Sequence, residues 1–67
     1  MTKKMLAERV VDTLYDDDLG CHILKGLVGD QVYDEYYDDR QILIDNVMCY
    51  SVAKLKELDK LLDRLRP

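Results

Sequence analysis

The chain is short and acidic: its 67 residues include 14 acidic and 10 basic side chains, for a formal net charge of −4, and only two cysteines. This length allows one domain at most, and two cysteines are too few for a disulfide-stabilised scaffold. A membrane-spanning helix needs about 20 consecutive apolar residues, which the sequence lacks. No signal peptide is evident, because Lys3 and Lys4 are not followed by an apolar run. We therefore expect a cytoplasmic protein without a membrane partner.

The first predicted element is an amphipathic helix over residues 3 to 15 or 17, with Thr2 as its N-cap. Its apolar residues recur at steps of three and four, which places them on one helix face. These residues are Leu6, Ala7, Val10, Val11 and Leu14.

Three aspartates follow, at residues 16–18. Negative charge is unfavourable at the end of one helix but favourable at the start of the next. Asp17 or Asp18 is therefore expected to cap a short second helix over residues 19–25, which Gly26 would end. Three apolar residues of this helix are candidates for the core: Leu19, Ile23 and Leu24.

Residues 26–39, GLVGDQVYDEYYDD, allow two interpretations. Gly29 and Asp30 could form the turn of a β-hairpin. Alternatively, Asp30 caps a helix with Val32, Tyr33, Tyr36 and Tyr37 on one side. Strand alternation would place Asp34 on the same face as Val32 and Tyr36, so the helix is favoured. It could continue into the following helix with a bend near residues 38 and 39.

The most periodic stretch is residues 38–66, which predicts one long C-terminal helix of about 40 Å. Asp38 with Gln41 resembles a capping box at its start. Apolar residues recur in the spacing of a heptad repeat, interrupted only by Ser51. They are Ile44, Met48, Leu55, Leu58, Leu62 and Leu65.

The predicted fold is therefore all-α, with two or three short N-terminal helices packed on this long helix. Short helices cannot cover the whole apolar strip, and exposed apolar surface marks an interface. Each buried leucine contributes about 1.5–3 kcal/mol, which is large for so small a domain. We expect a homodimer in which a second copy covers the six heptad residues named above and completes a helical bundle. Dimers and higher oligomers share this pattern.

The residues give little indication of catalysis or metal binding. Cys21 and His22 are adjacent, but neighbours on a helix point about 100° apart and do not form a catalytic pair. Together with Cys49 they supply too few ligands for a zinc site. Three aspartates at helical spacing (30, 34 and 38) make only a weak cation site. We expect a protein that is not an enzyme and has no cofactor.

The segment YDEYYDD is the most distinctive of the chain. Tyrosine offers a large rigid contact area with a polar tip, and is favoured at protein interfaces. Carboxylates on a helix surface can also imitate the phosphates that a nucleic-acid-binding protein recognises. The predicted partner-binding residues are Tyr33, Asp34, Tyr36, Tyr37, Asp38 and Asp39.

The charge is divided along the chain: residues 54–67 carry a net charge of +2 and residues 1–53 a net charge of −6. This division favours a non-enzymatic interaction protein that binds a basic protein partner through the acidic, tyrosine-rich surface, as an inhibitor of a nucleic-acid-binding protein. The alternative is direct nucleic-acid binding by the basic residues of the C-terminal helix, which the acidic remainder of the chain disfavours. Those residues are Lys54, Lys56, Lys60, Arg64 and Arg66.

Overall fold

The computed structural model describes residues 1–66, and within them the chain forms helices and no strand. The α-helices are α1 (Lys3–Tyr15), α2 (Asp18–Val28), α3 (Asp30–Tyr36), α4 (Arg40–Val47) and α5 (Val52–Leu62), followed by the 3₁₀-helix η1 (Asp63–Leu65). The predicted all-α class is confirmed. None of the helices in this part of the chain is both long and apolar enough to cross a membrane.

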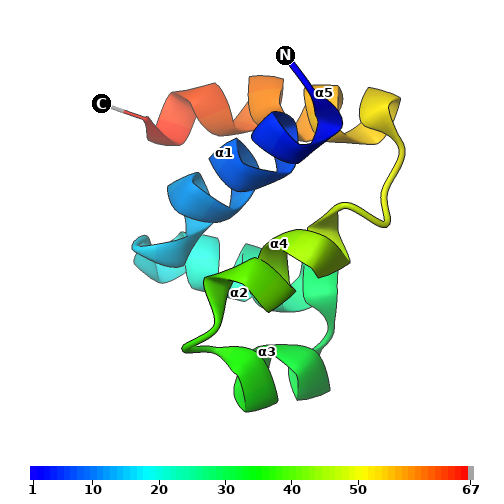
Figure 1. The fold of residues 1–67 in the computed structure, drawn as a ribbon. Coiled ribbons are helices and arrows are strands. Elements are labelled where there is room, and N and C mark those ends of the chain that lie inside the picture. The colour runs from blue at the N-terminus through cyan, green and yellow to red at the C-terminus, as the bar shows by residue number, and fades with distance from the viewer. Residues whose placement is uncertain (67) are drawn as a thin grey trace.

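Helix α1 is the central element and contacts α2, α4 and α5. In Figure 1 it lies between α5 on one side and α2 on the other, and α3 lies at the end of the molecule farthest from α5. The Thr2 side chain accepts a hydrogen bond from the Met5 N–H, as expected of an N-cap. The predicted apolar face is buried in full: Leu6, Ala7, Val10, Val11 and Leu14.

Helix α2 begins where its cap was predicted but extends further. The Asp17 carboxylate accepts a hydrogen bond of 2.6 Å from the Gly20 N–H. The helix then continues through Gly26 to Val28, so the expected end at Gly26 is wrong. It ends instead at Gly29, whose φ of +96° is accessible to glycine because this residue has no Cβ.

Only one of the three predicted core residues of α2 is buried. Leu24 is inaccessible, whereas Leu19 and Ile23 are 71% and 42% exposed. Gly20, which is buried, also lies against α1: a Cβ on Gly20 would be 2.6 Å from the Leu14 carbonyl oxygen. The backbones of the two helices therefore approach closely at this point.

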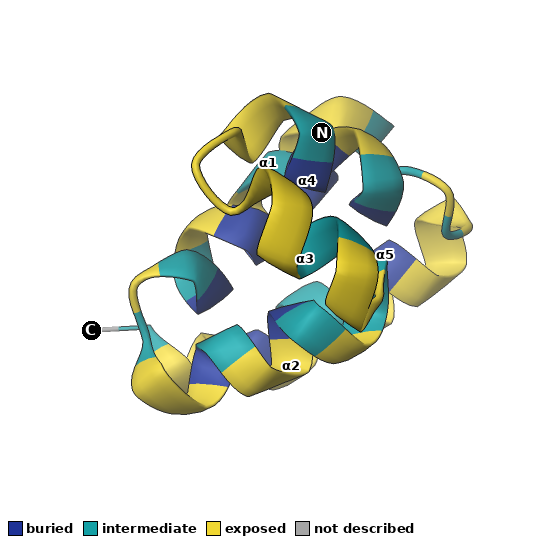
Figure 2. Cartoon of the chain, turned by 90° about the horizontal axis from the view of Figure 1, so that it is seen from below, coloured by how far each residue is buried: buried dark blue, intermediate teal, exposed yellow. Residues whose placement is uncertain are grey.

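Residues 26–39 were expected to form either a β-hairpin or a helix, and the structure has helix α3 at Asp30–Tyr36. It does not continue into α4, because the chain turns at residues 37–39 and the Asp39 carboxylate caps α4 by accepting a hydrogen bond from the Ile42 N–H. Asp39, rather than Asp38, is thus the cap. No residue of α3 is buried, and Figure 2 shows this helix largely in the colour of exposed residues.

The predicted continuous helix over residues 38–66 is wrong. Helix α4 ends at Val47, and Ser51 adopts an extended backbone (φ −68°, ψ 157°) before α5 begins. The Ser51 hydroxyl accepts a hydrogen bond from the Lys54 N–H, which makes it the N-cap of α5. The Tyr50 hydroxyl donates a hydrogen bond of 2.8 Å to the Leu27 carbonyl and ties this turn to α2.

The physical reason for the break is the wide apolar surface of this region. Because the chain turns, both α4 and α5 pack against α1 and bury their apolar residues inside a single molecule. The core contains Leu43, Val47 and Leu55 at 0% exposure. One straight helix could not bring both of its halves against a helix as short as α1.

The break also removes most of the apolar surface on which the predicted dimer was based. Of the six heptad residues, Ile44, Leu55 and Leu62 are at most 6% exposed, and Met48 and Leu58 pack against the core. Only Leu65 remains well exposed, at 42%. The strip that was expected to need a second copy is covered largely by the chain's own helices.

Candidate protein-binding surface

Helix α3 and the turn that follows it carry the predicted binding residues, and contacts from two other helices hold them in place. The ring of Tyr37 stacks on that of Tyr15 in α1, with centroids 5.2 Å apart, and meets the ring of Tyr33 edge to face at 5.3 Å. The Tyr15 hydroxyl donates a hydrogen bond of 2.7 Å to the Tyr37 carbonyl. We call Tyr15, Tyr33 and Tyr37 the tyrosine cluster.

Two basic side chains lie over rings of the tyrosine cluster. The Lys25 ammonium of α2 is 6.0 Å from the centroid of the Tyr33 ring and 3.7 Å from the Asp34 carboxylate. The Arg40 guanidinium of α4 is 5.7 Å from the centroid of the Tyr15 ring and forms an ion pair with Asp12. Each cation therefore interacts with an aromatic face and with a carboxylate.

The environment of the cluster shifts two tyrosine pKa values upward. A hydrogen bond with the Cys21 thiol, together with burial, raises the pKa of Tyr33 well above its ordinary value. Burial, with the neighbouring Tyr37 and Asp38, raises the pKa of Tyr15. The Cys21 thiol also donates to the Tyr15 carbonyl at 3.4 Å, so its contacts belong to the packing of α2 against this cluster.

The exposed residues of α3 and of the turn that follows it are rich in carboxylates. Residues 29–39 contain five carboxylates and no basic side chain. All five lie on exposed residues, and in residues 1–66 the Lys25 contact to Asp34 is the ion pair that the structure gives them. The five are Asp30, Asp34, Glu35, Asp38 and Asp39, which together form what we call the acidic face.

The structure divides the predicted binding residues into two groups. Tyr33 and Tyr37 belong to the tyrosine cluster, where their rings are in contact. Tyr33 is half-buried, whereas Tyr37 is 41% exposed. Tyr36 is 40% exposed, and within residues 1–66 it takes part in neither an aromatic pair nor a cation–ring contact. The predicted aspartates belong to the acidic face.

Sequence reasoning missed the residues that position this surface. Tyr15, Lys25 and Arg40 come from three other helices, and Tyr15 is 22 positions away from its stacking partner Tyr37. No local spacing rule connects residues so far apart. Two further carboxylates, Asp30 and Glu35, could have been included, because both lie within the same charged segment.

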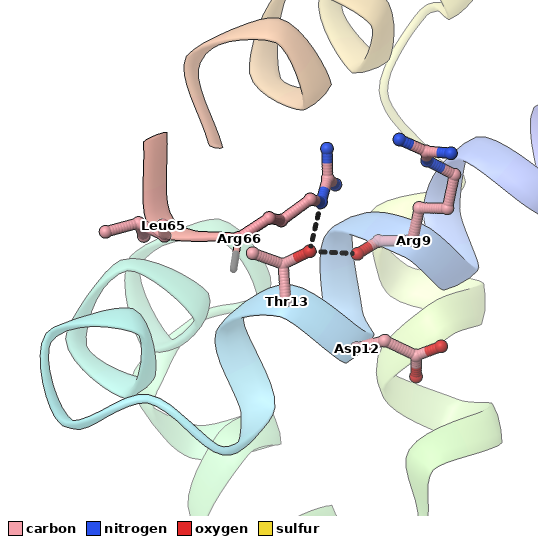
Figure 3. A pocket seen from close by; sticks show the side chains of 5 residues that line it. All are labelled: Arg9, Asp12, Thr13, Leu65 and Arg66. Carbon is pink, nitrogen blue, oxygen red and sulfur yellow. Dashed lines mark hydrogen bonds between the residues drawn. The ribbon is translucent and has the colours of Figure 1, made fainter. Parts of the chain in front are cut away.

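A second candidate site is a shallow hollow of about 470 Å³ between α1 and the end of the chain, lined by Arg9, Asp12, Thr13, Leu65 and Arg66. Figure 3 shows the Arg66 side chain extending over Thr13, between Leu65 and Arg9. Arg66 Nε donates a hydrogen bond of 2.9 Å to the Thr13 hydroxyl, which itself donates to the Arg9 carbonyl at 2.8 Å.

Each charged side chain that lines this hollow pairs with an opposite charge outside it: Asp12 pairs with Arg40, and both Arg9 and Arg66 pair with Asp59. The Asp59 carboxylate accepts hydrogen bonds from Arg9 at 3.1 Å and from Arg66 at 2.6 Å, and Arg66 also donates to Asp63 at 2.7 Å. Burial alone would raise the pKa of Asp59, but the hydrogen bonds from the two guanidinium groups outweigh it and lower this pKa. These contacts hold Arg66, at the end of the described residues, against α1, and the residues that line the hollow include no nucleophile paired with a base.

The residues considered for catalysis, metal binding and nucleic-acid binding differ in exposure. Cys21 is half-buried, whereas His22 and Cys49 are exposed. Over the described part of the chain, no group of three or more His, Cys, Asp or Glu side chains is placed to hold a metal ion. Four of the five basic residues of the alternative nucleic-acid site are exposed (Lys54, Lys56, Lys60 and Arg64), whereas Arg66 is engaged with Asp59 and Asp63.

Comparisons of the chain with models of protein families, with curated proteins and with solved structures gave no match.

Proposed function

We propose that this protein is a small, non-enzymatic helical interaction protein that binds a basic protein partner through α3. The observation that supports this proposal most directly is the acidic face: five exposed carboxylates on a short segment without a basic residue. By contrast, Asp59 in α5 forms ion pairs with Arg9 and Arg66 of the same molecule. A partner rich in lysine and arginine would supply the cations that the acidic face lacks.

The proposed action is competition with nucleic acid for that partner. A nucleic-acid-binding protein recognises a row of phosphates with Lys and Arg, and a row of carboxylates can occupy the same groups. The tyrosine cluster favours such binding because it holds α3 and the following turn in one conformation. A surface that is already ordered loses less conformational entropy when it binds.

The location and the assembly are proposals of the same kind. A cytoplasmic setting is compatible with the two unpaired cysteines, Cys21 and Cys49. Self-association is supported by apolar residues that the fold leaves exposed. Leu61 at 59% and Leu65 at 42% lie near the C-terminal end, and Leu19 at 71% lies in α2. Light scattering on the purified chain, compared with a Leu61→Lys/Leu65→Lys variant, tests this proposal directly.

The main experiment is a capture from the native host followed by a competition assay. The immobilised chain is incubated with nuclease-treated lysate, and each captured protein is then tested for displacement from its own nucleic acid by the soluble chain. We expect displacement by the wild type and its loss in an Asp34→Asn/Asp38→Asn/Asp39→Asn variant. Asn can still accept the capping hydrogen bond at residue 39, so this variant should keep α4 intact.

A matched control removes three exposed carboxylates from other helices and turns: Asp16→Asn/Asp45→Asn/Glu57→Gln. It has the same net charge as the first variant but keeps the acidic face. If the two variants displaced nucleic acid from the partner equally well, the assignment of the binding surface to α3 would be refuted. Salt-sensitive binding of the chain itself to DNA or RNA in a filter assay would instead favour the alternative function, in which the basic residues from Lys54 to Arg66 bind nucleic acid.

A further inference from the structure

Helix α3 is the least buried α-helix of residues 1–66. None of its residues is buried, whereas each of α1, α2, α4 and α5 has at least two that are. It has only seven residues, and an isolated helix shorter than about 12 residues is marginal in water. Its N-terminus also lacks a side-chain cap, because Gly29 stands at that position. The stability of α3 therefore depends on the contacts that it makes with other elements.

These contacts lie in the helix and in the turn that follows it. In the helix, Val32 and Tyr33 are half-buried and pack against the core. In the turn, the ring of Tyr37 stacks on that of Tyr15, and the Tyr15 hydroxyl donates a hydrogen bond of 2.7 Å to the Tyr37 carbonyl. The ion pair between α2 and α3 has side chains that are 38% and 68% exposed, so it contributes little. Tyr15, the last residue of α1, is thus a principal link between this segment and the rest of the molecule.

The two ends of α3 allow it to leave its neighbours without disturbing them. At its start, Gly29 has a φ of +96°, and nothing lies within 4 Å of where its Cβ would be, so the backbone has room to rotate. At its end, α4 begins with a cap of its own, the Asp39 carboxylate. Figure 1 shows α3 at one end of the molecule, and α1 contacts α2, α4 and α5 without its help. The other helices can therefore stay packed when α3 moves.

We propose that α3 is a lid over α2 and α4 that opens transiently as one unit, and that Tyr15 holds it closed. Opening removes Val32 and Tyr33 from the core and exposes the apolar surface beneath them. A segment that buries little apolar area opens at a lower free energy than the whole domain unfolds. This inference goes beyond the proposed function and does not depend on it. A partner that binds only the closed lid would favour the closed state.

The experiment is native-state hydrogen exchange, followed by NMR at increasing urea concentrations. In the wild type, the α3 amides should exchange faster than the core amides of α1 and depend less on urea, because opening exposes less surface than unfolding. Tyr15→Phe keeps the ring but removes the hydroxyl, so it should speed exchange of the α3 amides by about two- to tenfold. The control is Ser51→Ala, which removes the cap of α5. It should speed exchange of the α1 core amides and leave α3 unchanged.

Three results would contradict the lid. If the amides of α3 and α1 exchanged at the same rate and with the same urea dependence, α3 would open only when the whole domain unfolds. The same conclusion would follow if Ser51→Ala accelerated the α3 amides as much as the α1 core amides. An unchanged rate of α3 exchange in Tyr15→Phe would overturn the role of Tyr15 in holding the lid closed.

Discussion

Asp59 and Arg66 are joined by a hydrogen bond of 2.6 Å, with only 18% and 20% of their side-chain areas exposed. The same carboxylate accepts from Arg9 of α1, so one group connects the first helix, the last helix and the end of the described chain. This contact is the best-shielded ion pair of residues 1–66, because in each of the other pairs at least one side chain is 45% exposed or more. Its energetic contribution should therefore be measurable, unlike that of most surface pairs.

Replacing the acceptor should destabilise the protein in a pH-dependent way. Asp59→Asn should lower the free energy of unfolding at neutral pH by roughly 1–2 kcal/mol, because two guanidinium groups lose a charged partner. The pKa of Asp59 is lowered by folding from an ordinary value of 3.8. Its contribution is therefore present above that value and is lost as the pH falls through the lowered pKa.

Urea unfolding followed by circular dichroism at several pH values measures this difference. The gap between wild type and Asp59→Asn should be full at neutral pH and close below about pH 4. The control is Asp63→Asn, whose carboxylate has a side chain 65% exposed and should matter little. A gap that stays constant down to low pH would show that the variant acts through packing rather than through the charge.

Two glycines of α2 should respond to alanine with opposite signs. A Cβ at Gly20 would lie 2.6 Å from the Leu14 carbonyl oxygen and 2.8 Å from its Cα, so Gly20→Ala forces α1 and α2 apart. We expect a loss of about 1–3 kcal/mol. At Gly26 nothing lies within 4 Å of such a Cβ, and the residue is inside a helix. Gly26→Ala should stabilise the protein by about 0.4–1 kcal/mol. Thermal unfolding of the two variants checks both signs, and a loss at Gly26 would contradict the open space seen there.

The effect of replacing Ser51 on stability depends on whether the helix is broken at this residue or continuous through it. As the N-cap of α5, its hydroxyl accepts from the Lys54 N–H, and Ser51→Ala should cost about 1 kcal/mol. In a continuous helix the same change would be stabilising, because alanine is the better helix former. The urea midpoint of Ser51→Ala measures the sign. Ser51→Asp, which keeps a capping oxygen, should retain most of the wild-type stability.

The tyrosine cluster should make the protein sensitive to alkali. The pKa of Tyr33 is raised above its ordinary 10.0 through the Cys21 thiol and burial, so the neutral hydroxyl is favoured in the folded state. Its contribution to stability is complete below pH 10 and is lost as the pH rises through the raised pKa. Titration of the tyrosinate absorbance should show a late phase that Tyr33→Phe reduces but does not abolish, because the pKa of Tyr15 is raised as well. Tyr36→Phe serves as the control and should leave this phase unchanged.

The sequence by itself determined the features that depend on neighbouring residues. The stripe from Leu6 to Leu14 predicted the buried face of α1, and Asp17 predicted the start of α2, because periodicity and capping act within one or two helical turns. The helical state of residues 30–36 followed from the same local spacing. The acidic, tyrosine-rich composition that defines the candidate surface was likewise readable without coordinates.

Only the tertiary structure decided which apolar faces meet. The heptad spacing continues from Met48 to Leu55 with Ser51 as its one polar position. This spacing did not reveal that a helix ends there, because periodicity records a helix face but not whether the helix must bend to bury it. Leu19 and Leu24 were both expected to face the core, yet only Leu24 is buried, and the close approach of the α1 and α2 backbones at Gly20 limits how α2 can be oriented. The stack of Tyr15 on Tyr37 likewise depends on three helices having already packed. The burial of apolar area depends on how the whole chain packs, and the core has room for only some of the apolar side chains, which come from residues far apart in sequence.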